Sequence, residues 1–515
     1  MRVAYSWRRV LAVSWLAGVA GCAQLPEHPD PPDAVTPSVA EDTALDRALA
    51  PVEARHPENS GFRLVIEGRE AFAVRAQSAR MAARSLDVQT YIWHADTTGL
   101  FLAQQVLEAA DRGVQVRLLV DDMDARAKNA GFAALAAHPH IAVRLFNPFA
   151  TRSGGLRLAG EGVRDFSRIN RRMHNKSWIA DNRIALVGGR NLGDEYFSAS
   201  DAVNFVDLDF VMIGPVVRDV SASFDRFWNS SSAWPMESLD AAAVNEAALE
   251  KLRDRLAAHA AAARDSEYAQ ALRDDDGIRK LAAGEWALQW SARYRFVSDD
   301  PAKVTMKKRD AARAAVAVAI APMIRDSQQQ VQVISPYFVP GKRGTASLIK
   351  RAKAGTRVQI LTNSLAANDV AAVHGGYSRH RKQLVEGGVA LWELKPAGGK
   401  AAESSIKGSS GASLHTKALT ADGRASFVGS YNLDPRSTWL NTEQGVLVED
   451  PVLAGQLSGI FALQTNGSRA WQVSLEGDEL RWTDGELSYD SDPKASAGQR
   501  FQAWLARIFH IDAHL

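Results

Sequence analysis

Short runs of apolar residues, separated by longer amphipathic stretches, recur along most of the chain. Residues 86–91 and 113–120 have the pattern of buried strands, and a stretch with helical periodicity lies between them. Residues 331–337 and 355–361 repeat this strand–helix–strand order in the second half. Strands that alternate with helices are typical of a layered α/β unit. The pattern therefore predicts an α/β fold that is present twice.

The two predicted units share their internal spacing, because Gly113 lies 61 residues before His174 and Gly355 lies 60 residues before His415. We expect the body to consist of a first α/β domain at 60–235, an Ala-rich helical connection at 236–300, a second α/β domain at 301–470 and a C-terminal extension at 471–515. In the extension, apolar residues at helical spacing predict a helix that packs on the core, with membrane contact as the alternative: Trp504, Leu505, Ile508 and Phe509.

The beginning of the chain has the pattern of an export signal. Basic residues precede an apolar stretch at 10–20, which is too short for a conventional transmembrane helix. The stretch ends in Val-Ala-Gly-Cys, which resembles the lipobox of bacterial lipoproteins, and Cys22 is the only cysteine. We expect residues 1–22 to be a signal peptide, Cys22 to be lipidated and the Pro-rich residues 23–59 to form an extended tether. The alternative is a plain secretory signal in which Cys22 is incidental.

This interpretation makes the protein an exported one, held by its lipid anchor on a bacterial membrane, on the periplasmic side in a Gram-negative cell. The 515 residues with 46% hydrophobic content suffice for two or more globular domains. The formal net charge of +2 is nearly balanced and gives no global attraction to nucleic acid. We therefore expect no nucleic-acid partner.

One unusual string, His-x-Lys-x4-Asp-x6-Gly-(Gly/Ser)-x-Asn, occurs twice, once in each predicted domain. By average residue usage, such a string arises by chance in roughly one chain of this size in a hundred thousand. The two copies place the same chemistry at equivalent positions: His174, Lys176, Asp181 and Asn191 in the first, and His415, Lys417, Asp422 and Asn432 in the second. A duplicated chemical site is the cause that we infer.

The spacing within each copy predicts its local geometry. In an extended segment the His and the Lys share one face, because side chains alternate. The dipeptides that begin at Asp181 and Asp422 have the composition of hairpin turns, and the strands that follow return Asn191 and Asn432 to the His and Lys. We therefore expect a structural role for the two Asp residues.

Together the copies offer two His, two Lys and two Asn, without the Cys or carboxylate cluster that a metal demands, so we expect neither a metal nor another cofactor. The set suits a phosphodiester. Lys and Asn can hold the nonbridging oxygens, one His can attack phosphorus, and the other can protonate the leaving alcohol. A neutral and a protonated His can coexist near pH 7, because small shifts around the ordinary pKa of about 6.5 separate them. A single His would more often be a hydrogen-bonded core residue, but the joint recurrence favours function.

The doubled string resembles the His-Lys-Asp signature of the phospholipase D superfamily over nearly the whole body, residues 61–515. Flanking strings are similar to the class C branch of bacterial cardiolipin synthases, at residues 89–94, 170–176, 187–197, 361–369 and 432–437. The resemblance implies two α/β/α sandwich domains related by pseudo-twofold symmetry, with one active site at their interface. It also implies a role for each motif residue: His174 as nucleophile, His415 as general acid, and Lys176, Lys417, Asn191 and Asn432 as the grip on phosphate.

In this family a carboxylate after each motif orients the histidine. That position falls on Glu443 in the second half, and on Asp207 in the first half, where aligning Pro215 with Pro451 puts it opposite Glu443. Gly189 stands where the superfamily commonly has Ser, which would remove one hydroxyl from the phosphate site.

The resulting hypothesis is a membrane-tethered phosphatidyltransferase. His174 would attack a phospholipid, His415 would protonate the departing alcohol, and a phosphatidyl-histidine would remain. The free hydroxyl of phosphatidylglycerol, deprotonated by His415, would then yield cardiolipin. The sequence leaves the donor phospholipid open; phosphatidylglycerol is an expected substrate and phosphatidylethanolamine a candidate. If water accepts instead, the enzyme is a phospholipase D that releases phosphatidic acid. A nuclease and a catalytically silent lipid-binding lipoprotein are less favoured, since the anchor argues against the first and the two intact His-Lys pairs argue against the second.

Overall fold

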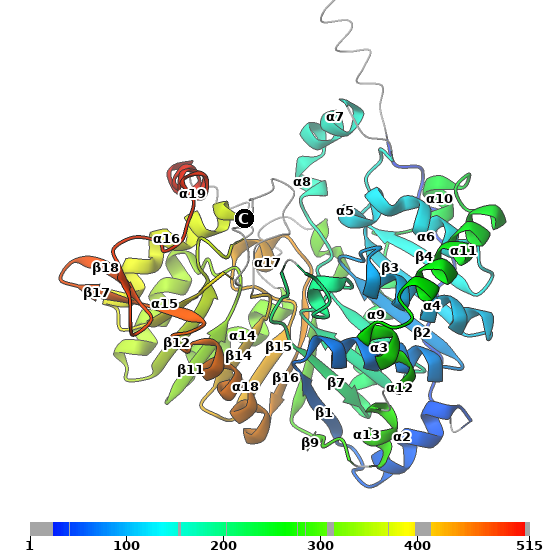
Figure 1. Ribbon diagram of the computed structural model, residues 1–515, viewed down its shortest axis with the longest axis horizontal. Helices are drawn as coiled ribbons and strands as arrows, with labels where there is room; N and C mark the ends of the chain where they lie inside the picture. The colour runs from blue at the N-terminus through cyan, green and yellow to red at the C-terminus, as the bar shows by residue number, and fades with distance from the viewer. Residues whose placement is uncertain are drawn as a thin grey trace, which may run out of the picture.

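Two mixed β-sheets face each other across a central seam, and helices cover them (Figure 1). The computed structural model describes residues 24–40, 42–152, 156–201, 203–274, 277–283, 285–305, 314–368, 370–396 and 414–509. Cys22 and the predicted signal peptide at residues 1–22 lie outside this part of the chain. The predicted pair of α/β domains is confirmed.

The first sheet has the strand order β8-β4-β3-β2-β5-β6-β7-β1-β9. Its strands are β1 (Ser60–Val65), β2 (Ser85–Thr90), β3 (Gln115–Asp121), β4 (Ile141–Phe146), β5 (Ser177–Ala180), β6 (Ile184–Gly188), β7 (Asp209–Ile213), β8 (Ala233–Pro235) and β9 (Gln289–Ser291). The helices of this half and of the connection are α2 (Ala44–Ala54), α3 (Gly68–Met81), α4 (Thr97–Asp111), α5 (Asp122–Ala125), α6 (Asn129–Ala136), α7 (Leu156–Arg164), α8 (Phe166–Ile169), α9 (Pro215–Trp228), α10 (Met236–Asp240), α11 (Glu246–Ala262), α12 (Glu267–Asp274) and α13 (Gly277–Ala283).

The second sheet has the order β10-β16-β15-β14-β11-β12-β13-β17-β18-β19. Its strands are β10 (Tyr294–Ser298), β11 (Gln330–Ile334), β12 (Arg357–Asn363), β13 (Ala390–Leu394), β14 (Ala418–Ala421), β15 (Ala425–Gly429), β16 (Gln444–Glu449), β17 (Ala470–Glu476), β18 (Glu479–Thr483) and β19 (Ser488–Tyr489). Its helices are α14 (Ala315–Arg325), α15 (Gly341–Lys353), α16 (Ala371–Glu386), α17 (Pro435–Trp439), α18 (Pro451–Gln464) and α19 (Ala497–Phe509).

The two sheets repeat one topology. Strands β1 to β8 occupy the same relative places in the first sheet as β10 to β17 do in the second. In each sheet three consecutive strands run parallel, β2, β3 and β4 in the first and β11, β12 and β13 in the second, and helices connect them. The remaining pairings within each set of eight are antiparallel. The duplication inferred from the motif spacing therefore extends over the whole of each domain.

The predicted hairpin turns lie between β5 and β6 and between β14 and β15. Asp181 and Asn182 have φ of 52° and 55°, and Asp422 and Gly423 have φ of 55° and 63°. Two consecutive positive φ angles define the tight turn that matches the twist of a hairpin. The carboxylate of Asp181 accepts hydrogen bonds from the backbone N–H groups of residues 83–85, and that of Asp422 from residues 328–330. Each Asp thus ties its hairpin to the beginning of the neighbouring strand.

Residues 23–59 are not simply an extended tether, as the proline content suggested. The backbone N–H of Thr36 donates to the Asp225 carboxylate at 2.9 Å, so the described part of this segment lies along the first domain. Helix α2 follows and buries Leu45, Leu49 and Val52. Their i, i+4, i+7 spacing forms an apolar stripe that the Pro-rich composition obscured.

The connection and the extension also differ from the predicted segments at their ends. Residues 236–300 are helical only as far as Ala283, and then β9 joins the first sheet while β10 joins the second. The second domain continues past residue 470, because β17 is an integral strand of its sheet. Among the described residues, no helix is both long and apolar enough to cross a membrane.

The C-terminal helix α19 packs through its small residues and not through its large apolar ones. Ala503 and Ala506 are buried against α16, where a Cβ on Gly375 would lie 2.5 Å from the Ala503 carbonyl oxygen. Phe501 and Trp504 are 58% and 53% exposed. The helical spacing was predicted correctly, but Trp504 and Ile508 of the expected core-packing face are exposed.

A hydrophobic core crosses the seam and joins the two halves. It includes Phe62 and Phe210 of the first sheet together with Val446 and Val448 of the second, all buried. An apolar interface of this kind holds two domains in a fixed relation. The relative position of the two motifs is therefore set by packing.

Candidate active site

The two motif histidines come from corresponding positions, just before β5 and just before β14. The backbone N–H of His174 donates to the carbonyl of Thr442 at 2.9 Å, and that of His415 donates to the carbonyl of Val206 at 2.9 Å. Both acceptors belong to the opposite domain. Each catalytic segment is thus aligned by the other half, and the seam brings the two half-sites together.

The carboxylates that hold the histidines are exchanged between the domains. Nδ1 of His174 lies 2.9 Å from Oε2 of Glu443, and Nδ1 of His415 lies 2.6 Å from Oδ2 of Asp207. Both carboxylates are fully buried. Because Nδ1 is engaged, Nε2 of each ring is the nitrogen left for chemistry. The sequence indicated which carboxylates matter, but not that each one serves the histidine of the other repeat.

Ser430 and Gly189 occupy equivalent positions against these two carboxylates, and the contact differs between the repeats. The Ser430 hydroxyl donates to Glu443 Oε2 at 2.5 Å. A Cβ on Gly189 would lie 2.2 Å from Asp207 Oδ1, so Asp207 leaves no room for a side chain at this position. The expectation that Gly189 removes a hydroxyl from the phosphate site was wrong, because the equivalent hydroxyl serves a carboxylate.

The two lysines are buried and held in the same way. Nζ of Lys176 donates to the carbonyl of His174 at 2.6 Å, and Nζ of Lys417 donates to the carbonyl of His415 at 2.5 Å. This contact between positions i and i+2 keeps each Lys on the same side as its His, as the alternation predicted. Beside burial, the charges of Lys176 and Lys417 lower the pKa of both His174 and His415, so each lysine acts on both rings.

The two asparagines are buried beside the motifs. Nδ2 of Asn191 donates to the Tyr196 hydroxyl at 2.9 Å, and its Oδ1 accepts the backbone N–H of Ile92 at 3.3 Å. Oδ1 of Asn432 is buried, and no group in the described part of the chain forms a hydrogen bond with it. A buried polar atom without a partner is costly in a folded protein. This makes Asn432 a candidate contact for a bound molecule.

Aromatic rings flank both histidines. Tyr91 lies edge-on to His174 with 5.3 Å between ring centroids, and Tyr196 and Phe205 lie 5.2 and 5.3 Å from His415. Such walls exclude water and lower the local dielectric. Tyr91 ends the strand predicted at residues 86–91, whereas the sequence pattern did not single out Tyr196 or Phe205. The signal for Tyr196 was its position five residues after Asn191.

The electrostatics of the site hold both histidines neutral. Burial lowers the pKa of His174 to about 4, although Glu443 opposes the shift. Burial and the two lysines place the pKa of His415 well below its ordinary value. The expectation that small shifts around the ordinary pKa separate the pair was wrong, because the same burial and the same lysines lower the pKa of both rings. A protonated general acid therefore requires a change in the site's charge.

Burial also lowers the pKa of Lys176 from 10.5 to about 7. The unfolded chain then binds a proton between these pH values that the folded protein does not, so the folded state loses stability as the pH falls through this window. We expect Lys176→Met to abolish this loss. The free energy of unfolding of the variant, relative to the wild type, should rise by about 1–4 kcal/mol between about pH 10 and pH 7 in urea titrations.

Lys342→Met, at an exposed position, is the matched control and should show no such trend. A difference between Lys176→Met and the wild type that stays constant over the same pH range would contradict the assignment.

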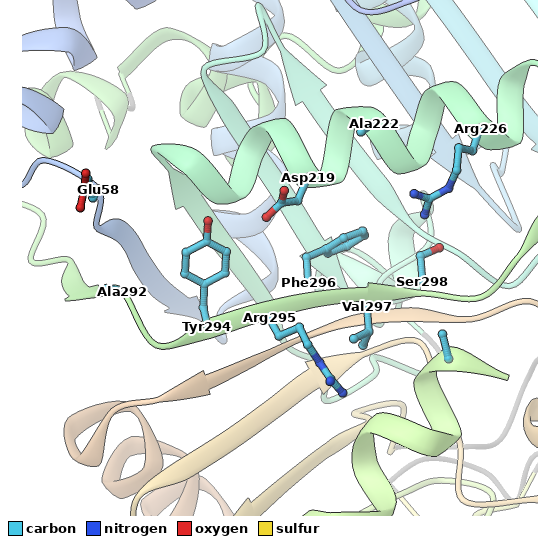
Figure 2. A pocket seen from close by; sticks show the side chains of 11 residues that line it. Glu58, Asp219, Ala222, Arg226, Ala292, Tyr294, Arg295, Phe296, Val297 and Ser298 are labelled. Carbon is cyan, nitrogen blue, oxygen red and sulfur yellow. The ribbon is translucent and has the colours of Figure 1, made fainter. Parts of the chain in front are cut away.

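A cavity of about 590 Å³ between α9 and β10 is not this site, since none of the motif residues lines it. Figure 2 shows Asp219 on α9 and Tyr294 on β10 pointing toward one another, while Arg295 and Val297 point to the other side of the strand. The cavity carries charges of both signs and lacks the paired His and Lys. It lies between a helix of the first domain and a strand of the second sheet.

Comparisons with known proteins agree with this geometry. A family model described as "Cardiolipin synthase, PLD-like domain" matches residues 76–228 and 320–463. Cardiolipin synthase C of Escherichia coli strain K12 is 40% identical over 479 residues, which cover 91% of this chain and 99% of that protein. An uncharacterized protein of Helicobacter pylori strain J99 is 30% identical over 92% of each chain.

Among solved structures, phosphatidylserine synthase of Haemophilus influenzae superposes with a TM-score of 0.57 at 14% identity, over 91% of this chain and 100% of its own. At this identity the likeness shows the fold alone. The doubled motif, the duplicated sheets and the family match lead to one assignment. The chain belongs to the phospholipase D-like cardiolipin synthases, a family of phosphatidyltransferases.

Proposed function

We propose that the protein forms cardiolipin from phosphatidylglycerol and a second phospholipid through a phosphatidyl-histidine on His174. The observation that carries the proposal is the pair of imidazoles, each with Nδ1 bound to a buried carboxylate and each followed by a buried lysine that is bonded to the carbonyl of its histidine. A neutral imidazole is a nucleophile, and the lysines can stabilise the charge that develops on the phosphoryl oxygens.

In the first step Nε2 of His174 forms a bond to phosphorus, and the bond from phosphorus to the headgroup oxygen breaks. His415 supplies the proton to that oxygen and becomes neutral. In the second step His415 removes the proton of the acceptor hydroxyl, whose oxygen displaces His174 from phosphorus. The proton balance closes, because His415 returns to its protonated form.

Substrate binding itself supplies the condition for the first step. In the free protein, burial and the neighbouring lysines keep His415 neutral. The negative charge of a phosphodiester placed among these cations opposes their effect and raises the pKa of His415. Burial raises the pKa of Glu443, but its interactions with His174, Lys176 and the Ser430 hydroxyl outweigh burial and leave that pKa below its ordinary value. That carboxylate stays charged and stabilises the ring as positive charge develops on it.

Product identification tests the proposal. Purified protein is incubated with vesicles of phosphatidylglycerol, with and without phosphatidylethanolamine, and the lipids are analysed by mass spectrometry. We expect cardiolipin, with free glycerol or ethanolamine identifying the donor. Phosphatidic acid alone would replace the proposal with a phospholipase D, and cleavage of nucleic acid without lipid turnover would replace both with a nuclease.

We also propose that the protein is exported and lipid-anchored through Cys22. The N-terminal pattern supports this, and the exposed Phe501 and Trp504 on α19 suit a protein that works against a lipid surface. Cys22→Ser should abolish labelling by a fatty-acid analogue and release part of the protein from the membrane fraction. Full labelling of the Ser variant would refute the anchor.

A further inference from the structure

A second cavity, of about 500 Å³, opens on the second repeat between α14, α15 and the segment after Asn432. One face of α14 lines it with apolar residues at helical spacing, namely Ala317, Ile320, Ala321 and Ile324. Tyr431 and Leu433, the chain neighbours of Asn432, form another wall. The size is that of a small-molecule site, and its lining is mainly apolar. The cavity therefore begins where the second motif ends.

The mouth of this cavity is positively charged. Lys342 and Arg343, in the first turn of α15, both line it and are exposed. Its acidic group, Asp434, is buried and accepts the backbone N–H of Ser437 at 2.7 Å, which caps α17. Apolar walls below two cations match a molecule with an apolar tail and an anionic head.

The first repeat is different at the equivalent place. The backbone N–H of His94 donates to the carbonyl of Leu192 at 2.7 Å, and that of Val339 donates to the carbonyl of Leu433 at 2.8 Å, so His94 corresponds to Val339. Val339 lines the cavity, whereas Nδ1 of His94 lies 3.1 Å from Oε1 of Glu195 in a polar cluster. The apolar opening thus distinguishes the second half-site from the first.

We propose that this cavity holds an acyl chain of the anionic phospholipid whose phosphatidyl group His174 takes. The inference rests on the proposed function and names the substrate contact behind it. Tyr431 follows Ser430, whose carbonyl oxygen lies 3.1 Å from Nδ1 of His174. One wall of the cavity is therefore formed by the chain neighbour of a residue that contacts His174, and Lys342 and Arg343 supply the positive charge for the anionic headgroup.

Two neighbouring residues of α15 provide a matched test. Ser347 lines the cavity and Ala346 does not, and both are exposed. We expect Ser347→Trp to raise KM for long-chain phosphatidylglycerol about tenfold, the effect of removing about two methylene groups from apolar contact. Its kcat/KM for bis(p-nitrophenyl) phosphate, a soluble diester without acyl chains, should not change. Equal KM values for Ser347→Trp and Ala346→Trp would overturn the proposal.

A second measurement does not depend on turnover. Phosphatidylglycerol with a photoreactive diazirine at the end of one acyl chain is irradiated with the wild-type protein, and the labelled peptides are mapped by mass spectrometry. We expect labels on α14 and α15, and labels confined to other elements would overturn the proposal. If the wild type makes no cardiolipin but is labelled on these helices, the proposed reaction fails while the chain-binding site stands.

Discussion

His174→Ala is expected to lower turnover of phospholipid about 10⁵-fold or more, because it removes the nucleophile on which both steps depend. His415→Ala should cause a loss of similar size with natural substrates, since the headgroup oxygen then leaves without a proton. The two variants differ with bis(p-nitrophenyl) phosphate, whose leaving group needs no proton. His415→Ala should release one equivalent of nitrophenol in a burst and accumulate a phosphohistidine, whereas His174→Ala should do neither.

The measurement is stopped-flow absorbance, combined with intact-protein mass spectrometry at neutral pH. The wild type is the reference for the burst, and the double variant sets the background. A burst in His174→Ala together with none in His415→Ala would reverse the assigned roles. Turnover by the double variant would refute histidine catalysis altogether.

Glu443→Gln should behave like a His174 variant, and Asp207→Asn like a His415 variant, each with a loss of about 10²–10⁴-fold. The reason is the exchange across the seam, in which Glu443 holds His174 and Asp207 holds His415. With bis(p-nitrophenyl) phosphate we therefore expect Asp207→Asn to keep the burst and Glu443→Gln to lose it.

If each carboxylate held the histidine of its own repeat, Asp207→Asn would lose the burst and Glu443→Gln would keep it. The burst therefore shows which carboxylate holds which histidine. Asp219→Asn is the matched control, because this carboxylate faces Tyr294 in the cavity between α9 and β10, which neither histidine lines. It should leave both burst and turnover unchanged. Circular dichroism should verify that the carboxylate variants fold, since both carboxylates are buried.

The local geometry of each motif was predictable because it depends on short-range rules. Alternation in an extended segment placed Lys176 on the side of His174, and the Asp181 dipeptide specified a tight turn. The duplicated topology was predictable for a similar reason. Nearly the same number of residues separates the glycine from the histidine in each half, so the same strands and helices are expected between them. Both features can be predicted without knowing how the two domains pack against each other.

What the sequence did not reveal depends on the contact between the halves. The exchange of Glu443 and Asp207 follows from the way the seam is packed, and no local pattern records it. The strong lowering of both histidine pKa values has the same origin, because burial and the lysines of both repeats act on each ring. The packing of α2 and the exposed face of α19 were missed because composition and periodicity do not show where an apolar stripe finds its partner.

The exchange of carboxylates has a consequence for how such a chain can arise and change. Within a single repeat the histidine and the carboxylate do not contact each other. A repeat therefore obtains a carboxylate on Nδ1 of its histidine only by pairing with a second copy. Fusion of the two copies makes that pairing permanent and allows the copies to diverge. Changes are then linked across the seam, because Asp207 and Gly189 of the first repeat must remain compatible with His415 of the second. The residues that evolve together are therefore a histidine of one domain and a carboxylate of the other, and not the residues of a single domain. If the two domains are expressed as separate chains, activity should return only when they reassociate.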